Sequence, residues 1–165
     1  MIELVDYTAE DEVEILKRMA DFFGIHRELY DESTSNNQEI AETLNEWISH
    51  DHSLFVILFE AVSVGFVHIC CRGENVAWIE DIYVDRKHRG KGIASQAIKL
   101  SEEIIARDKN YDAVCIDAVP RNIEALKLYY RLGYTNLSMI TVRKELYDDK
   151  KRDRKLNFLG FDYTY

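Results

Sequence analysis

The sequence predicts one α/β domain spanning residues 1–165, with a mixed, mostly antiparallel sheet that contains a central parallel strand pair and is flanked by helices. The chain is 47% hydrophobic and 31% charged, which suits a globular domain with its own core. Short apolar runs with strand character alternate with amphipathic helical runs. Residues 76–118 have the pattern strand, helix, strand, and such a crossover joins parallel neighbours.

The first 50 residues predict one strand and two helices. Residues 2–7 alternate as a strand, and Thr8 with Asp11 forms a helix-start signal. Gly24 is expected to end or bend the helix that follows. The apolar face of this helix is expected to be Val13, Leu16, Met19, Ala20 and Phe23. The second helix is expected to bury Ile40, Leu44, Trp47 and Ile48.

The middle of the chain predicts a hairpin followed by the crossover. Residues 54–60 and 64–70 form antiparallel strands around a turn at Val62 and Ser63. The crossover consists of a strand over Val76–Val84, a helix over Ile93–Arg107 and a buried strand over residues 113–118.

The last third predicts a short helix and two further strands. Asn122 opens the helix and Gly133 stops it as a C′ glycine. Residues 136–146 and 156–165 read as strands, and a basic loop over residues 150–155 separates them.

Charge and cysteine usage narrow the function classes. The net charge is −9, with 15 acidic and 3 basic side chains in residues 1–60, but 15 and 18 in residues 61–165. Nucleic-acid binding needs a basic face, and the net charge of this chain is negative. A membrane span needs a longer apolar run than any in the sequence. The Cys and His residues lack the spacing of metal ligands. We therefore expect no nucleic-acid, membrane or metal partner, and a reduced, cytoplasmic protein. The acidic first half either attracts a cationic ligand through its electrostatic field or consists of solvent-exposed helix faces.

The stretch from Val84 to Ala94 (VDRKHRGKGIA) gives the strongest functional signal. Gly90 and Gly92 flank Lys91 where a polar loop becomes a helix. Glycine lets the backbone approach a ligand closely, and the first N–H groups of a helix bind anions. The stretch therefore predicts a phosphate-bearing ligand. A P-loop is excluded because Gly92 follows Lys91, and Ser95 stands where a Rossmann loop needs glycine or alanine.

The hexapeptide Arg89–Ala94 resembles the R/Q-x-x-G-x-G/A signature of the GNAT superfamily of acetyl-coenzyme A-dependent N-acetyltransferases. The resemblance implies that loop amides hold the pyrophosphate of acetyl-coenzyme A, and that the preceding strand offers backbone groups to the pantetheine and the acyl carbonyl. The coenzyme-binding residues that it implies are Ile82, Tyr83, Val84, Arg89, Gly90, Lys91, Gly92, Ile93 and Ala94.

Residues 122–134 resemble the second signature of the same superfamily, N-x-x-A-x-x-x-Y-x-x-x-G-F/Y, position by position. The resemblance implies that Asn122 approaches the pantetheine or supports the loop, and that the Tyr129 hydroxyl reaches the coenzyme sulfur. Both signatures have the order and separation that the superfamily requires. The resemblance covers residues 54–146 well and the first 50 loosely, and it implies a GNAT-like fold.

The segment Ile79–Val84 (IEDIYV) resembles the L-E-D-x-x-V strand of polyamine acetyltransferases. Because neighbouring strand residues point to opposite faces, we expect only one of Glu80 and Asp81 to line the cleft. The resemblance favours Glu80 as the general base, directly or through water. Tyr129 is the expected general acid, because a tyrosine with a reference pKa of about 10 is protonated at neutral pH. The five histidines and Cys115 match no catalytic position and are expected to pack or to lie at the surface.

The predicted function is therefore transfer of an acetyl group from acetyl-coenzyme A to a primary amine by direct attack in a ternary complex. The acceptor is expected to be a cationic small molecule resembling a polyamine or an aminoglycoside. Alternatives are a protein N-terminal or lysine acetyltransferase, a non-catalytic acyl-coenzyme A sensor, and an interaction domain that uses the acidic first half.

The last ten residues carry more aromatic and apolar surface than a free tail should expose. They are predicted either to form an edge strand that contributes to a homodimer or to pack within their own subunit.

Overall fold

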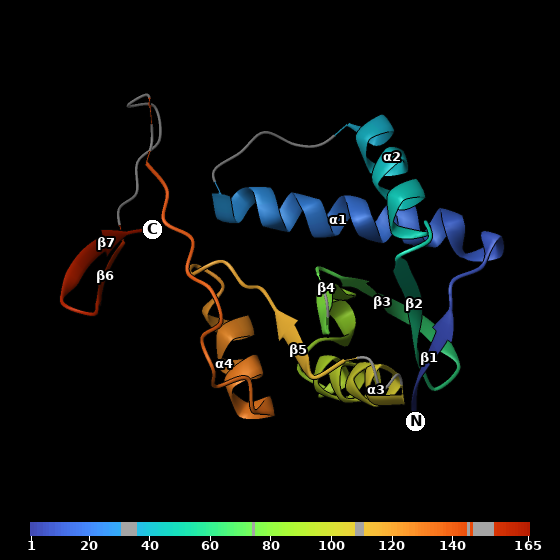
Figure 1. Ribbon diagram of the computed structural model, residues 1–165. Helices are drawn as coiled ribbons and strands as arrows, with labels where there is room; N and C mark the ends of the chain where they lie inside the picture. Colours follow the sequence, from blue (N-terminus) through green and yellow to red (C-terminus); the bar gives the residue numbers. More distant parts are fainter. Residues whose placement is uncertain (31–35, 74, 108–110, 145, 147–153) are drawn as a thin grey trace.

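The computed structural model describes residues 1–30, 36–73, 75–107, 111–144, 146 and 154–165. Five strands form one sheet in the order in which they occur in the chain (Figure 1). They are β1 (Ile2–Asp6), β2 (His52–Phe59), β3 (Val62–Cys71), β4 (Val76–Val84) and β5 (Ala113–Ile116). The pairs from β1 to β4 are antiparallel and β4–β5 is parallel, which confirms the predicted fold class.

Within the part of the chain that the structure describes, four helices cover the two faces and one edge of this sheet. They are α1 (Glu12–Tyr30), α2 (Asn37–Trp47), α3 (Ile93–Arg107) and α4 (Ile123–Leu132), with short 3-10 helices at Ala9–Asp11 and Arg86–His88. Figure 1 shows α1 and α2 on one side of the sheet, α3 on the other and α4 beside β5. Accordingly there are two cores: one joins α3 to the sheet around Ile57 and Ile79, and the other joins α1 and α2 to it around Phe66.

The buried face of α1 differs from the predicted one. The helix continues through Gly24, and its buried residues include Ile15, Met19 and Phe22, spaced four and three residues apart. Val13, expected inside, is 76% exposed. Of the predicted stripe, Met19 is fully buried, and Leu16 and Phe23 pack against the same core while partly buried. The centre of the buried face is displaced because a shift of one residue rotates a helical face by about 100°.

The hairpin turn also lies earlier than predicted. Glu60 and Ala61 form it, both with positive φ (53° and 62°), whereas Val62 and Ser63 already belong to β3. A two-residue turn with positive φ at both positions matches the twist of the strands that it joins.

A β-bulge in β4 places Glu80 and Asp81 on the same face of the sheet. His68 pairs with Asp81 whereas Ile69 pairs with Ile79, so Glu80 is an extra residue. Glu80 contacts Cys70 and Asp81 contacts His68, and residues two apart on one strand share a face. The expectation that the two carboxylates point to opposite faces is therefore wrong.

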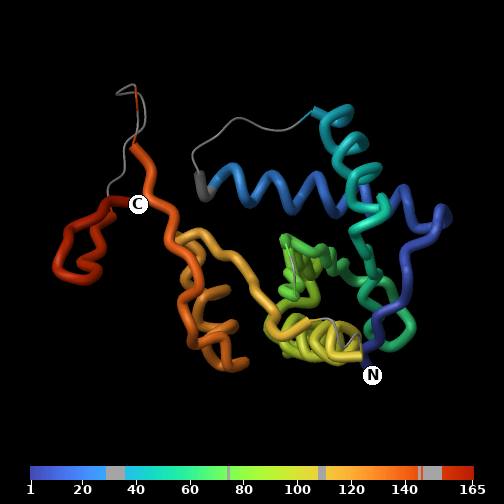
Figure 2. The backbone as a smooth tube through the Cα atoms, viewed as in Figure 1, coloured from blue at the N-terminus to red at the C-terminus, as the bar shows by residue number. Residues whose placement is uncertain are grey.

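Two predictions for the C-terminal third are wrong as well. No described residue between 136 and 146 is in a strand, and the apolar side chains of Leu137, Met139 and Val142 are exposed. Residues 156–165 contribute to two strands, β6 (Lys155–Phe158) and β7 (Phe161–Thr164), rather than one. This hairpin lies apart from the main sheet (Figures 1 and 2). Most of the basic loop lies outside the described residues.

A buried arginine ties α1 to the ends of β3 and β4. Arg18 is only 7% exposed. Its guanidinium donates to Asp85 Oδ1 from Nε at 3.1 Å, to Ser63 Oγ at 2.9 Å and to the Ser63 carbonyl at 2.8 Å. A buried charge is tolerated only when it is paired and hydrogen-bonded, so this cluster fixes where α1 lies above β4.

We expect Asp85→Ala to lower the free energy of unfolding by about 2 kcal/mol, because it removes a hydrogen-bonded anion from a buried cation. Urea denaturation would measure the change. Asp51→Ala, in an exposed turn, is the matched control and should change stability by less than about 0.5 kcal/mol. Equal effects of the two substitutions would contradict the anchoring role of Asp85.

Candidate active site

A cleft forms where β4 separates from β5. The parallel pairing stops at Ile79 and Ile116, whereas β4 continues to Val84. A cavity of about 850 Å³ lies beside this unpaired half of β4 and is also lined by α1, the loop before α3, the start of α3, and α4. Every predicted coenzyme-binding residue except Lys91 lines it.

The glycine loop leaves open space at the mouth of α3. Gly90 and Gly92 have φ values of 77° and 76°, and a Cβ built on either would meet nothing within 4 Å. The Gly92 carbonyl accepts the first helical hydrogen bond, from Gln96 N at 3.1 Å. The N–H groups of the first turn of α3 have no partner within the helix, and Ile93 and Ala94 of this turn line the cavity. Backbone donors and free space therefore coincide, as an anion-binding loop requires.

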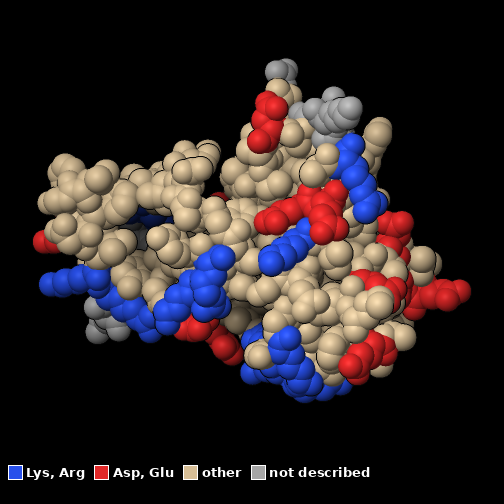
Figure 3. Space-filling model, turned by 90° about the horizontal axis from the view of Figure 1, so that it is seen from below, with Lys and Arg blue, Asp and Glu red and all other residues tan. Residues whose placement is uncertain are grey.

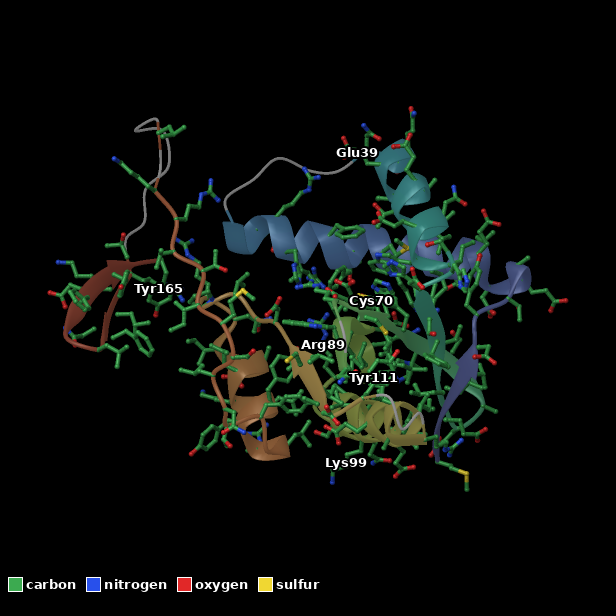
Figure 4. All side chains as sticks on the ribbon, in the orientation of Figure 1. Glu39, Cys70, Arg89, Lys99, Tyr111 and Tyr165 are labelled. Atoms are coloured by element: carbon green, nitrogen blue, oxygen red, sulfur yellow. The ribbon has the colours of Figure 1, made fainter. Side chains whose placement is uncertain are left out.

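Arg89 and Lys91 leave the loop in different directions. Arg89 Nε donates to the Val84 carbonyl at 2.9 Å, and its guanidinium lies 5.5 Å from the centre of the Tyr83 ring. Figure 4 labels this side chain beside β4. The ammonium of Lys91 lies 5.8 Å from the Phe59 ring. Arg89 thus fastens the loop to β4, and Lys91 packs on β2.

Helix α4 brings Asn122 and Tyr129 to the same cavity. The Asn122 side chain accepts a hydrogen bond from Ala125 N at 3.3 Å and caps the helix. Tyr129 lines the cavity, whereas Tyr130 is 69% exposed. Burial, with a smaller contribution from the Asp81 carboxylate, raises the pKa of Tyr129 to about 12. The phenol therefore keeps its proton throughout the physiological pH range.

Glu80 is held outside the cavity lining. Its carboxylate accepts a hydrogen bond from Cys70 Sγ at 2.8 Å and forms an ion pair with Arg72, which also binds Asp117 at 3.1 Å. Burial and the neighbouring Glu80 raise the pKa of Cys70 to about 12. The thiol is therefore protonated and unreactive at neutral pH.

A sequence profile described as the acetyltransferase (GNAT) family matches residues 18–134 of the 165. The chain belongs to this family. The resemblance carried by the two signatures is thereby confirmed, and the chain falls in a class of acyltransferases.

Relatives of the GNAT chain differ in how much of it they match. It is 36% identical to a thialysine N-epsilon-acetyltransferase of Bos taurus over 73 residues, 44% of this chain and 42% of that protein. The chain thus spans less than half the length of the curated relatives that it matches. Two solved structures share the fold at 18% identity. They are a ribosomal-protein-alanine N-acetyltransferase from Brucella melitensis (TM-score 0.65, 87% and 99% coverage) and AAC(6')-Iy in complex with a bisubstrate analog (0.64, 88% and 99%).

Sequence reasoning missed several residues that line the GNAT cleft. Phe22, Ile25 and His26 come from α1, and Arg121, Arg131 and Arg154 add positive charge from the other side. Neither signature contains these positions. The sequence offered two other signals: His26 lies outside the predicted apolar stripe, and Arg154 lies in the basic loop. Burial lowers the pKa of His26, so its ring is neutral at pH 7.

None of the helices among the described residues has the length and apolar character of a membrane span. The described part of the chain also contains no group of three or more His, Cys, Asp or Glu side chains arranged to hold a metal ion.

Proposed function

We propose that residues 1–165 act as one N-acetyltransferase domain that moves an acetyl group from acetyl-coenzyme A to a primary amine by direct attack in a ternary complex. The observation that carries this proposal is the cleft itself. It joins the unpaired half of β4, the glycine loop and Tyr129 around a single cavity. One chamber thus offers backbone groups for a thioester, donors for phosphates and a proton for a leaving thiolate.

The coenzyme half of the cleft suits a long, phosphate-bearing molecule. The open space at Gly92 adjoins the amides of Ile93 and Ala94, and Arg121 and Arg131 line the same cavity. Ile82, Tyr83 and Val84 lie along the unpaired edge, where a pantetheine arm would add hydrogen bonds as a further strand does. Asn122 supports the cleft by capping α4.

We expect acetyl-coenzyme A to raise the melting temperature of the protein through binding to the folded state. Gly92→Val should abolish this shift, because a branched side chain would fill the space for the pyrophosphate. Differential scanning fluorimetry measures the effect. Gly73→Val is the matched control, since Gly73 also has positive φ (90°) and open space but lies in the β3–β4 turn. A folded Gly92→Val protein with unchanged affinity would refute the loop assignment.

Tyr129 is the proposed general acid. When the bond between the acyl carbon and sulfur breaks, the electron pair goes to sulfur, and a proton from the Tyr129 hydroxyl converts the thiolate to a thiol. Water then returns a proton to the phenolate. The raised pKa of Tyr129, about 12, keeps the donor protonated at every pH at which the enzyme would work.

Tyr129→Phe should lower kcat about 10- to 1,000-fold, as expected for the loss of general-acid help. Coenzyme affinity should change little because the ring and its packing remain. Tyr130→Phe removes a hydroxyl from the neighbouring exposed ring and should be nearly silent. Steady-state rates of the two variants with the best acceptor decide whether Tyr129 acts as a general acid. If neither variant loses rate, Tyr129 only packs.

The proposed acceptor is a cationic small molecule, with protein N-termini or lysines as the alternative. The curated relative acts on thialysine by its name, which supports an amine-bearing small molecule. The Asp81 carboxylate adds negative charge within electrostatic reach of the cavity-lining His26 and Tyr129. The acidic first half gives less support, because its residues at the cavity are Phe22, Ile25 and His26. Figure 3, which views the molecule from below, shows acidic side chains mainly at the centre and right, whereas basic side chains lie at the left and bottom and also among the acidic ones.

A thiol-release assay across polyamines, aminoglycosides, thialysine, lysine and peptides tests the proposal. Release of coenzyme A thiol that depends on an amine supports the enzyme. Binding of acetyl-coenzyme A without release for any acceptor supports a sensor, and the absence of binding leaves an interaction domain. A reducing compartment such as the cytoplasm suits the three free cysteines.

We also propose that the protein forms a homodimer through its C-terminal third. Leu156, Leu159, Phe161 and Tyr163 of the β6–β7 hairpin are exposed, and so are Leu137, Met139 and Val142. An exposed apolar surface of this kind marks an association site. A second copy of the chain is the proposed occupant, since unpaired strand edges pair with each other.

Light scattering should report a dimer for the full chain and a monomer for a chain that ends at Arg154. Phe161→Glu should also weaken the dimer, because it places a charge in the apolar surface. A monomer at every concentration for the full chain would reject the proposal.

A further inference from the structure

Three side chains on adjacent strands form a hydrogen-bonded chain on the α1–α2 face of the sheet. Asp81 Oδ2 on β4 lies 2.8 Å from His68 Nδ1 on β3, and His68 Nε2 lies 2.8 Å from His52 Nδ1 on β2. The two imidazole rings are stacked at 5.0 Å, and Trp47 of α2 stacks on His68 at 4.4 Å. His68 is 3% exposed, so the middle of this chain is sealed from water.

Asp81 precedes the cavity-lining Ile82 on β4, although, like Glu80, it is not among the residues that line the cavity. It shares a strand face with Tyr83, which lines the cavity and donates to Asp21 of α1. The Asp81 carboxylate also contributes to the pKa of His26 on α1 and of Tyr129 on α4, both cavity-lining residues. It therefore lies within electrostatic reach of the two sides of the cleft.

The neighbouring carboxylate is engaged differently. Glu80 forms an ion pair with Arg72 and accepts from Cys70, so a positive charge already neutralises it. Neither carboxylate lines the cavity, so the two differ in their partners rather than in their access to it. Asp81 is held by an imidazole, and one of its oxygens has no hydrogen bond among those found in the described part of the chain.

We propose that Asp81, rather than Glu80, binds the ammonium group of the acceptor and takes its proton, and that His68 and His52 position it. The inference rests on the proposed acetyltransferase function and deepens it. His52 and His68 belong to neither family signature, so the signatures do not imply this arrangement.

The hydrogen bonds determine which atoms of His52, His68 and Asp81 act as donors and which as acceptors. With a proton on Nδ1 of each ring, His52 donates to His68 Nε2 and His68 donates to Asp81 Oδ2, so every contact joins a donor to an acceptor. Oδ1 then stays available to the substrate. The N–H bond of the ammonium breaks, its electron pair stays on nitrogen for attack on the acyl carbon, and the proton forms an O–H bond on Asp81. After the attack, the nitrogen loses a second proton to water as the bond between the acyl carbon and sulfur breaks. Water removes the proton on Asp81 after the product leaves.

The first experiment compares two isosteric changes. Asp81→Asn should lower kcat/KM for the amine about 100-fold or more near pH 7, as for the loss of a general base. Its rate should recover as pH rises, because more of the amine is then already neutral. Glu80→Gln should stay within about threefold of the wild type. The groups facing Asp81 are His68 from β3, His26 from α1, Tyr129 from α4 and Glu80 beside it. His26→Gln is therefore measured too, and it should leave the acid limb of the profile in place.

The second experiment tests positioning. His68→Leu should lower kcat about tenfold, and His68→Asn, which keeps a donor near the Nδ1 position, should restore part of it. His50→Gln is the histidine control, because His50 is exposed and takes no part in the hydrogen bonds that join His52, His68 and Asp81. In ¹⁵N spectra of the histidine rings, Asp81→Asn should change the tautomer signals of His68 without any need for turnover.

The outcomes separate this inference from the proposed function. Full activity and an unchanged pH profile in Asp81→Asn would overturn the role given to Asp81. Equal loss of rate in His68→Leu and His68→Asn, together with imidazole spectra that Asp81→Asn leaves unchanged, would overturn the role given to His68. Neither outcome would affect the proposed acetyltransferase function. A wild-type protein that binds no acetyl-coenzyme A and releases no thiol would overturn the proposed function and this inference with it.

Discussion

The separation of β4 from β5 is the constraint on which the rest of the structure depends. A parallel pair that ran the full length of β4 would satisfy the backbone of Glu80 to Val84 and leave no room for a substrate. Pairing over only four residues on each strand keeps the sheet continuous and opens it at one end. The two cores hold this opening. The core beneath contains Ile79 and Ile93, and the core above places α1 over Tyr83.

Electrostatics then assign different roles to groups that are chemically alike. Glu80 and Asp81 are adjacent carboxylates on one face, yet one faces a guanidinium and the other an imidazole. An ion pair with arginine keeps a carboxylate charged and occupied, because the guanidinium does not lose its proton. The different roles proposed for Glu80 and Asp81 therefore rest on their side-chain partners rather than on the residue type.

The sequence was most informative where structure is local. The glycine loop, the capped helix α4 with Gly133 at its end (φ 102°) and the crossover of β4, α3 and β5 follow from motifs and periodicity. The bulge at Glu80 could not be predicted, because it depends on the register between β3 and β4, which are joined across a turn. The buried stripe of α1 failed for a similar reason: Arg18 is buried because Asp85 and Ser63, far away in sequence, receive it. The C-terminal segment has strand-forming residues, but a strand also needs a partner.

The two tryptophans of the chain stand beside the two carboxylate networks. Trp78 lies under the Arg72 guanidinium at 4.5 Å, and Trp47 stacks on the His68 ring. Indole emission responds to a cation or an imidazolium in contact with the ring. The partner of each carboxylate therefore contacts a tryptophan: Arg72 beside Glu80 contacts Trp78, and His68 beside Asp81 contacts Trp47. When one tryptophan is replaced, the fluorescence of the other reports changes at only one of the two carboxylates.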